Sequence, residues 1–242
     1  MIVAQSINKS FGKLKVLRNI SLTCNKGEAI ALIGPNGSGK TTFIKCLLGL
    51  VLPDNGTIMF NNKNIMRQCQ YRSAIGYMPQ IGRYPENMTM GQIFEMIIDL
   101  RKNENQTTDK ELIEAFELEK MFHKRMRTLS GGTRQKVSAS LAFLFNPQVL
   151  ILDEPTAGLD PVATEILKEK IRKEKQQGKL ILITSHILSD LDDLVSEIVY
   201  FNEGHLLFHK NITLLRNETG EEKLSRAIAY IMKSNLMQKT IN

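Results

Sequence analysis

Short runs of apolar, mostly branched residues recur along the chain and alternate with stretches whose apolar residues have helical spacing. The runs IALIG at 30–34, VLILD at 149–153 and LILITS at 180–185 are apolar at almost every position. Strands that are apolar on both faces indicate a parallel sheet covered by helices on each side. The pattern therefore predicts an α/β core, with one helix from about Lys40 to Leu50 and another after Pro161.

Two other regions have different patterns. The segments IVAQSI and VLRNISLTCN near the start, and TIMF at 57–60, alternate between apolar and polar residues, which predicts an antiparallel layer beside the parallel sheet. Helical spacing predicts three helices in the middle of the chain: Met90–Leu100, Thr108–Leu118 and Ser130–Phe145. Thr108-x-x-Glu111 has the spacing of a capping box at the start of the second one. We expect one domain over residues 1–215 with a helical insertion at about 80–145, followed by a short helical tail over 216–242.

Composition excludes several classes of protein. With 42% hydrophobic and 24% charged residues in 242, the chain is typical of globular proteins rather than disordered or fibrous ones. The longest uncharged run, Val137–Leu152, is interrupted by Asn146-Pro147-Gln148, and a membrane span needs about 20 apolar residues. No signal peptide pattern opens the sequence. We expect a chain that does not cross a membrane and stays in the cytosol.

The net charge and the numbers of cysteine and histidine residues exclude fewer functions than the overall composition does. The excess of 32 basic over 25 acidic residues permits a nucleotide, nucleic acid or acidic lipid as partner, but it is spread along the chain, and an ordinary solvated surface accounts for it too. Cys24, Cys46 and Cys69 have no C-x-x-C spacing, so buried free thiols are expected rather than disulfides or a zinc site. The histidines are scattered without metal-ligand spacing.

One segment has the spacing of a phosphate-binding loop. Gly34-Pro35-Asn36-Gly37-Ser38-Gly39-Lys40-Thr41 fits G-x-x-x-x-G-K-[ST] and lies between a predicted strand and a predicted helix. Glycines let backbone N–H groups surround the β-phosphate, and the helix N-terminus adds its positive end. Lys40 would reach the β- and γ-phosphates, the Thr41 hydroxyl would bind Mg²⁺, and Thr42 follows in the same turn. The sequence predicts ATP and Mg²⁺ as ligands.

Two adjacent carboxylates end the predicted strand at 149–153. Asp153 would hold Mg²⁺, and Glu154 would polarise a water molecule toward the γ-phosphorus. An Asp-Glu pair after a strand can also cap a helix or form a surface turn. The phosphate-binding loop upstream favours the catalytic interpretation.

With these motifs the sequence resembles the ATP-binding cassette (ABC) ATPases, from about Ile2 to Asn211. Leu129-Ser130-Gly131-Gly132 is similar to the family signature. Ser130 would open a helix, and Gly131 and Gly132 would leave bare N–H groups at its positive end, able to bind a γ-phosphate. The resemblance implies that this phosphate belongs to the ATP of a partner subunit.

The resemblance implies roles for four more residues. Gln80 matches the Q-loop glutamine, which senses the γ-phosphate and Mg²⁺, and His186 matches the switch histidine, which contacts the γ-phosphate. Asp160 lies in the D-loop, Ala157-Gly158-Leu159-Asp160, and Asp160-Pro161 also suits the start of a helix. Phe11 corresponds to an aromatic residue that stacks on adenine. Without the resemblance, Gln80 would be a loop residue, His186 structural and Phe11 a core residue.

Two positions depart from the usual family pattern. Thr133 replaces the glutamine that most often follows the signature glycines, and Phe11 replaces the more frequent tyrosine. Neither change removes a phosphate ligand. Because the glutamine would contact the nucleotide sugar across the interface, nucleotide affinity and preference are affected more than the competence to hydrolyse.

The resemblance implies a homodimer that closes on ATP and opens after hydrolysis. It also implies permease subunits on separate chains, docking at about Ile81–Ile98, with the ATPase peripheral on the cytoplasmic face of the inner membrane. Exporter-type subunits, including those of haem export and nitrous oxide reductase maturation, look most similar. A ribosome- or DNA-associated ATPase is the alternative, although ribosomal members carry two cassettes and DNA-repair members long coiled coils; we expect no nucleic acid. A binding module that hardly hydrolyses ATP is a third interpretation, which Glu154 and His186 disfavour.

Two features outside the motifs have alternative interpretations. Met78, Met88, Met90 and Met96 suit an adaptable docking surface or, more simply, core packing. In the tail, Leu224, Ala227, Ile228 and Ile231 share one helical face. That face suits docking on the domain or its twin, or lying on a membrane surface.

Overall fold

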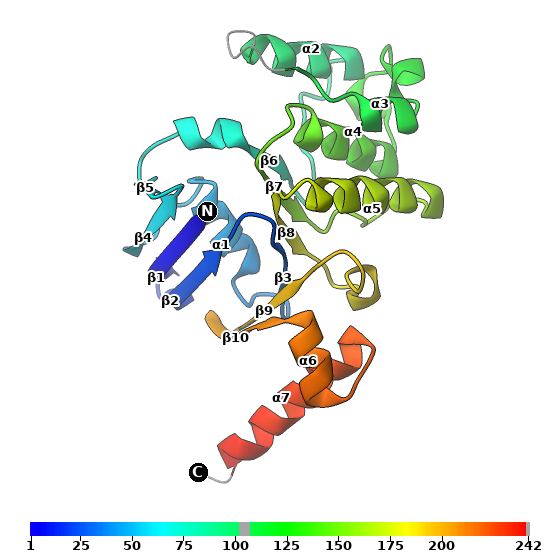
Figure 1. Ribbon diagram of the computed structural model, residues 1–242. Coiled ribbons are helices and arrows are strands. Elements are labelled where there is room, and N and C mark those ends of the chain that lie inside the picture. The colour runs from blue at the N-terminus through cyan, green and yellow to red at the C-terminus, as the bar shows by residue number, and fades with distance from the viewer. Residues whose placement is uncertain (102–106, 241–242) are drawn as a thin grey trace. The chain divides into compact units, whose positions relative to one another are not determined.

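The computed structural model describes residues 1–101 and 107–240. The chain forms two compact units. Their helices and strands are labelled in Figure 1. The first unit contains Met1–Arg67 and Thr184–Asn242, and the second contains Gln68–Ile183. Both units combine strands and helices, as the predicted α/β class requires.

The first unit contains the predicted antiparallel sheet, with strand order β2-β1-β4-β5. Its strands are β1 (Ile2–Phe11), β2 (Leu14–Cys24), β4 (Asn55–Phe60) and β5 (Lys63–Asn64). Ile2 pairs with Cys24 on one side and with Phe60 on the other. The alternation expected from the sequence is present, because Ile7 and Ile20 are fully buried while their neighbours face outward.

A second group of strands in this unit has the order β10-β9-β3. Its elements are β3 (Ala29–Ile33), α1 (Lys40–Leu47), η5 (Leu188–Asp190), β9 (Glu197–Asn202) and β10 (His205–Asn211). All five residues of β3 are buried, and β3 pairs with β9 in parallel, Ile30 opposite Glu197. Helix α1 ends before the predicted Leu50, because Gly49 takes a φ of 65° and turns the backbone.

The tail forms two helices, α6 (Ile212–Thr219) and α7 (Leu224–Thr240). The predicted apolar face is largely covered by the chain itself, since Leu224, Ala227 and Ile228 are buried. The Asp192 carboxylate accepts hydrogen bonds from the Leu224 backbone N–H at 3.2 Å and from the Arg216 guanidinium at 2.8 Å. The first turns of α7 therefore pack within the first unit.

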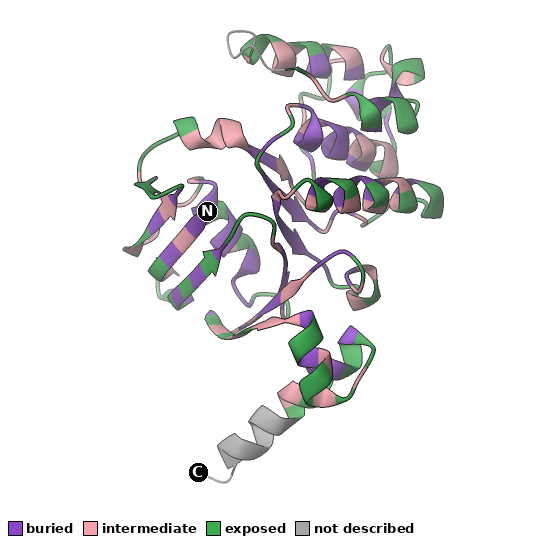
Figure 2. Cartoon of the chain, viewed as in Figure 1, coloured by how far each residue is buried: buried purple, intermediate pink, exposed green. Residues whose placement is uncertain are grey.

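In the second unit the strands lie in the order β8-β7-β6. They are β6 (Ile75–Met78), β7 (Val149–Asp153) and β8 (Leu180–Thr184), whose last residue belongs to the first unit. Strands β6 and β7 run parallel, with Ile75 opposite Val149. Every residue of β7 and β8 is buried (Figure 2), so the predicted two-sided burial and parallel pairing are confirmed.

Every regular element described between β6 and β7 is helical. These elements, with η1 before β6 and α5 after β7, are η1 (Gln70–Ala74), α2 (Met90–Leu100), α3 (Glu111–Ala115), η3 (Leu118–Met121), η4 (Met126–Thr128), α4 (Gly131–Phe143) and α5 (Pro161–Gln176). Helix α2 has the predicted bounds. It begins with a capping box that the sequence analysis missed, in which Thr89 and Gln92 each accept the other's backbone N–H. Met78 and Met90 are fully buried, which agrees with core packing, whereas Met88 and Met96 are half-buried.

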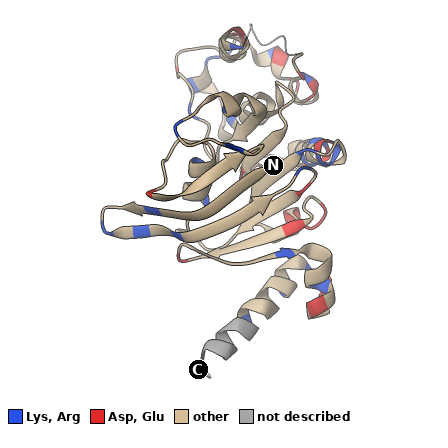
Figure 3. Cartoon of the chain, turned by 60° about the vertical axis from the view of Figure 1, so that its left-hand side comes forward, with Lys and Arg blue, Asp and Glu red and all other residues tan. Residues whose placement is uncertain are grey.

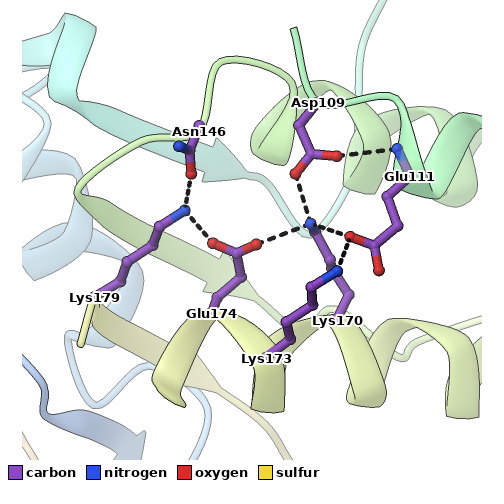
Figure 4. A network of polar contacts seen from close by, with 7 residues as sticks. All are labelled: Asp109, Glu111, Asn146, Lys170, Lys173, Glu174 and Lys179. Carbon is purple, nitrogen blue, oxygen red and sulfur yellow. Dashed lines mark hydrogen bonds and ion pairs between the residues drawn. The ribbon is translucent and has the colours of Figure 1, made fainter. Parts of the chain in front are cut away.

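The predicted capping box at Thr108 was wrong. Helix α3 begins only at Glu111, and Lys110 at its N-cap makes no side-chain capping bond. The Asp109 carboxylate instead accepts the Glu111 backbone N–H at 3.0 Å. The Glu111 carboxylate binds Lys170 and Lys173 on α5, so it does not return to the helix start (Figure 4). The Glu111 side chain therefore forms ion pairs with lysines far away in the sequence and is not available to cap its own helix.

Lys170 is the centre of this ion-pair network. Its side chain is 3% exposed, and its Nζ lies 2.6 Å from Asp109, 2.7 Å from Glu111 and 2.9 Å from Glu174. Burial alone would lower the pKa of Lys170, but the hydrogen bonds to the three carboxylates raise it above its ordinary value. Glu174, which is also buried, binds Lys179 as a second cation. The network fastens α5 to the start of α3.

The other basic residues, and the cysteines, do not form a comparable cluster among the residues that the structure describes. Lysines and arginines are distributed over many elements (Figure 3). Cys24 and Cys46 are buried free thiols as expected, and burial raises the pKa of Cys24 to about 12 and that of Cys46 to about 11. Cys69 is exposed, contrary to the expectation of buried thiols.

Candidate functional site

The phosphate-binding loop connects β3 to α1 in the first unit and depends on glycine backbone geometry. Gly34, Gly37 and Gly39 have φ values of 143°, 76° and 107°. A Cβ on Gly34 would lie 2.0 Å from the Phe201 carbonyl oxygen, and one on Gly39 would lie 2.8 Å from the Val16 carbonyl oxygen. Side chains are excluded at both positions for two reasons: the added Cβ would clash with these carbonyl oxygens, and each glycine has a φ that other residues rarely adopt.

Lys40 holds this loop in a compact form. Its Nζ donates to the Gly34 carbonyl at 2.7 Å and the Pro35 carbonyl at 3.0 Å, and the lysine is only 8% exposed. The Ser38 side chain is also buried, and its hydroxyl lies 3.4 Å from the same Nζ. A cation is thereby fixed against the loop backbone, next to N–H groups that begin α1. Pro35, Asn36 and Gly37 are exposed around it, as is Thr41 in the first turn, and Thr42 is half-buried.

Two other predicted residues lie in the first unit. His186 is exposed directly after β8, and the preceding Ser185 hydroxyl accepts from the Ile187 backbone N–H at 3.0 Å. Phe11 ends β1 and is 51% exposed, so it is no core residue. Its ring lies 5.4 Å from the Lys9 Nζ. An exposed aromatic face suits stacking on a planar base.

The two adjacent carboxylates lie in the second unit, at the end of β7. Asp153 is 4% exposed, and Glu154 follows it with a φ of 51°. A positive φ is costly for glutamate and is typically retained at functional sites. The Glu154 carbonyl accepts from the Gln135 side chain at 3.3 Å and from the Ala157 N–H at 3.1 Å. The turn is therefore held from two sides. The Gln135 contact has no local sequence signal, so it could not be predicted from the sequence.

The signature residues form the start of α4, as predicted. Ser130 is the N-cap, and its Oγ accepts the Thr133 backbone N–H at 3.2 Å. A Cβ on Gly131 would meet no atom within 4 Å, whereas one on Gly132 would lie 2.7 Å from the Gly158 carbonyl oxygen. One glycine thus faces open space, and the other permits close contact with the D-loop.

The D-loop residue Asp160 has two structural contacts in the same unit. Its carboxylate caps α5 by accepting the Ala163 N–H at 2.8 Å, with Pro161 in the first turn, as expected. It also accepts from Lys136 of α4 at 2.8 Å. The hydrogen bond from Lys136 and then that from Ala163 lower the pKa of Asp160. The role of Lys136 could not be predicted from the sequence, because none of its neighbours in the chain signals this contact.

Gln80 is exposed shortly after β6, beside a cavity of about 340 Å³. The cavity lining includes Tyr77, Arg83, Tyr84, Ile97, Arg101 and Phe145. Arg101 is fixed there, since its guanidinium stacks on Phe145 at 4.5 Å and donates to the Ser73 carbonyl at 3.1 Å. Among the residues that the structure describes, the lining contains two arginines and no carboxylate.

Comparison with known proteins identifies the family. The family model described as "ABC transporter" matches residues 17–157, which is more than half of the chain. The chain belongs to the ABC transporter family. It is 33% identical over 204 residues to the Nod factor export ATP-binding protein I of Burkholderia lata, covering 83% of this chain and 67% of that one.

A second relative and a solved structure support the same family. The lantibiotic transport ATP-binding protein SrtF of Streptococcus pyogenes is 32% identical over 210 residues, covering 87% of this chain and 90% of that one. A solved ATP-binding subunit of an ABC transporter superposes with a TM-score of 0.86 at 27% identity, covering 96% of this chain and 99% of that chain. This chain is therefore an ATP-binding subunit of the ABC type, and its enzyme class is ATPase.

The residues of this ABC subunit suit a nucleotide with a hard cation. Among the residues that the structure describes, no three His, Cys, Asp or Glu side chains gather into a metal site. Mg²⁺ commonly binds through one or two protein oxygens together with substrate phosphates, so a hydroxyl and a carboxylate suffice. Within residues 1–101 and 107–240, no helix combines the length and apolar content that crossing a bilayer requires.

Proposed function

We propose that this subunit hydrolyses ATP as a homodimer and thereby drives a permease carried on separate chains. The observation that carries the proposal is the start of α4, where Ser130 caps the helix and Gly131 faces open space. A helix N-terminus with accessible N–H groups is a strong anion site, and this one lies at the family signature. A second copy of the chain would supply the nucleotide that fills it.

Each nucleotide would be held by two copies. The phosphate-binding loop of one copy, with Lys40, would bind the β- and γ-phosphates, and Phe11 would stack on adenine. Ser130, Gly131 and Gly132 of the other copy would bind the γ-phosphate, with Asp160 in the D-loop beside them. ATP would favour the closed dimer because only that state contacts it fully. Loss of the γ-phosphate would reopen it.

Three further side chains have proposed roles in hydrolysis. Glu154 would orient and polarise the attacking water, and His186 would contact the γ-phosphate. Thr41, Gln80 and Asp153 would hold Mg²⁺, which supplies charge neutralisation on the phosphates when bound. The positive φ of Glu154 and the two hydrogen bonds to its carbonyl support a turn built to orient that side chain.

The permease would dock at residues Ile81–Ile98, beside Gln80. The cavity there is apolar and aromatic, and within the described part of the chain its charged lining residues are Arg83 and Arg101. Ile81 is 70% exposed and Leu100 is 76% exposed, so apolar side chains remain accessible. A short permease helix with an apolar anchor and a carboxylate would complement this surface.

Export is the proposed direction of transport. The two relatives described above are named for Nod factor export and for lantibiotic transport, and the subunit would work at the cytoplasmic face of the membrane through its permease. The finer resemblance to subunits of haem export and nitrous oxide reductase maturation stays a prediction. We also retain the division into a cassette over residues 1–215, with its helical insertion at about 80–145, and a tail over 216–242.

The test is the Glu154→Gln variant. We expect it to bind ATP like the parent, to hydrolyse ATP about 10²–10⁴-fold more slowly, and to accumulate as an ATP-bound dimer in sedimentation experiments. Hydrolysis at the parent rate would contradict the role of Glu154. An ATP-saturated variant that stays monomeric at all concentrations would contradict the shared-nucleotide dimer.

The permease is tested by purification from membranes in mild detergent. A polytopic membrane protein that co-purifies with the parent, and is lost when Arg101 is replaced by Glu, supports the proposed docking surface. Recovery of ribosomes or nucleic acid in place of a membrane protein would contradict it. The Lys120→Glu variant is the matched control, because Lys120 pairs with Glu117 and does not line the cavity.

A further inference from the structure

The signature serine has an unusual partner in this chain. The Ser130 Oγ receives the Thr133 backbone N–H at 3.2 Å and also lies 2.9 Å from the Thr133 Oγ1. Thr133 occupies the position at which the family most often has glutamine. A glutamine side chain is long enough to reach away from the helix, whereas the threonine hydroxyl here turns back onto the N-cap.

The hydrogen-bonding capacity of a hydroxyl limits what this pair can offer a ligand. Each hydroxyl has one proton to donate and two lone pairs to accept with. If the Thr133 hydroxyl donates to Ser130, both lone pairs of Ser130 are occupied, one by that hydroxyl and one by the Thr133 N–H. The hydroxyl proton is then the only hydrogen-bonding group that the Ser130 side chain can still offer. If the direction is reversed, the free proton belongs to Thr133.

An anionic acceptor next to Ser130 selects the first arrangement. A phosphate oxygen has no proton to give at this position, so it requires an outward-pointing donor. Donation from Thr133 to Ser130 polarises the Ser130 hydroxyl and strengthens its own outward bond. The open space at Gly131, the next residue, leaves room for such a ligand beside the N-cap.

We propose that Thr133 is a positioning residue that makes Ser130 a dedicated hydrogen-bond donor toward the terminal phosphate of the nucleotide. This inference rests on the proposed function, in which the signature of one copy binds the ATP of another. It explains part of the affinity of the signature for nucleotide by one residue, Thr133. The Thr133 hydroxyl acts on Ser130 and does not contact the nucleotide sugar.

The surrounding contacts fix the geometry that this role needs. Gly132 lies against the Gly158 carbonyl, and Arg134 pairs with Glu86 at 3.2 Å. Lys136, one turn beyond Thr133, pairs with Asp160 at 2.8 Å. The first turns of α4 are therefore held at several points, and the relative position of the two hydroxyls is set by the helix rather than by the ligand.

The experiment compares Thr133→Val with Thr133→Ser in the Glu154→Gln background. Valine keeps the shape and removes the hydroxyl, whereas serine keeps the hydroxyl and removes the methyl. We expect valine to raise the ATP concentration for half-maximal dimerisation by about three- to tenfold, the effect of one hydrogen bond, and serine to stay close to the parent. The inference would be overturned if Thr133→Val dimerised at the same ATP concentration as the parent, or if Thr133→Ser needed as much ATP as Thr133→Val.

A double-mutant cycle with Ser130→Ala separates this inference from the proposed function. If Thr133 acts through Ser130, Thr133→Val has no further effect once the serine hydroxyl is gone. Additive effects would overturn the positioning role, because Thr133 would then act independently. If Ser130→Ala leaves the ATP dependence unchanged, the Ser130 hydroxyl does not bind nucleotide and the inference fails, whereas the proposed function fails only if Glu154→Gln itself does not dimerise with ATP. Thermal unfolding of each variant separates these effects from a loss of folding.

Discussion

Lys136 of α4 and Asp160 at the start of α5 form an ion pair with 2.8 Å between Nζ and Oδ2. The other oxygen of the same carboxylate accepts the Ala163 N–H and caps α5. One side chain thereby ties the D-loop to the helix that begins at the signature. Both segments are proposed to meet the nucleotide in the dimer, so their relative position matters for activity.

The Lys136→Met variant removes this tie and keeps most of the apolar stem. We expect the free energy of unfolding to fall only slightly, because the pair is exposed to solvent and screened by it. The kcat for ATP should fall between about twofold and thirtyfold, the range for residues that couple two sites. Lys120→Met, which breaks an exposed pair with Glu117, is the control and should hydrolyse ATP like the parent. An unchanged kcat in Lys136→Met would show that the pair is only structural.

Gly131→Ala and Gly132→Ala should both lose ATP-driven dimerisation, but for different physical reasons. A methyl group on Gly131 meets open space, so thermal stability should be kept or raised, by up to about 1 kcal/mol from helix propensity. ATP-driven dimerisation should nevertheless be lost, because the methyl occupies the proposed phosphate position. A methyl on Gly132 would lie 2.7 Å from the Gly158 carbonyl, so that variant should lose stability as well. Calorimetry and sedimentation with ATP distinguish them, and full dimerisation by Gly131→Ala would contradict the proposed site.

Gly34→Ala should abolish nucleotide binding through the backbone. The added Cβ would lie 2.0 Å from the Phe201 carbonyl oxygen, so the loop must move. Gly178→Ala is the matched control, since Gly178 also has a positive φ, of 78°, but open space around it. It should lose about 1–2 kcal/mol of unfolding free energy and keep its ATP affinity. Binding of a fluorescent ATP analogue measures the difference, and parent-like affinity in Gly34→Ala would be the contradicting result.

Lys170→Met should be the most destabilising single change in the ion-pair network. It removes one of the two cations that bind the buried Glu174 carboxylate, and Lys179 remains. The free energy of unfolding should therefore fall by more than in Lys173→Met, but by less than the ~3–5 kcal/mol that a wholly unpaired buried charge costs. Lys173→Met removes an exposed partner of Glu111 and should cost about 0–1 kcal/mol. Urea unfolding of the two variants gives the comparison. Equal losses would show that burial of Lys170 has no energetic consequence.

The same network predicts an acid-side pH dependence. Hydrogen bonds from Lys170 first, and then from Lys173, lower the pKa of Glu111 below its ordinary value of 4.5. Because the folded-state pKa is the lower one, this stabilisation is fully present above about pH 4.5 and is lost as the pH falls through the folded-state pKa. Urea unfolding from about pH 6 to about pH 3 should therefore show a shallower decline for Glu111→Gln than for the parent. Identical declines would exclude Glu111 as a contributor.

Much of the fold could be predicted because its signals are local. Strands β3, β7 and β8 were found from runs that are apolar on both faces, and such runs fit only a covered sheet. Asp160-Pro161 and Ser130 were found as helix starts because capping involves only the next three residues. The start of α3 was mispredicted for the opposite reason, since its glutamate binds lysines on α5.

The sequence by itself determined the phosphate-binding loop, the carboxylates after β7 and the signature at the start of α4. Each depends on backbone geometry within a few residues, and glycine, proline and serine restrict that geometry directly. Only the tertiary structure decided which groups hold these motifs in place: Phe201 against Gly34, Gly158 against Gly132, and Lys136 on Asp160. Those partners are far apart in the chain, and side-chain type alone does not specify which distant group a residue will meet, because packing of the whole unit selects it.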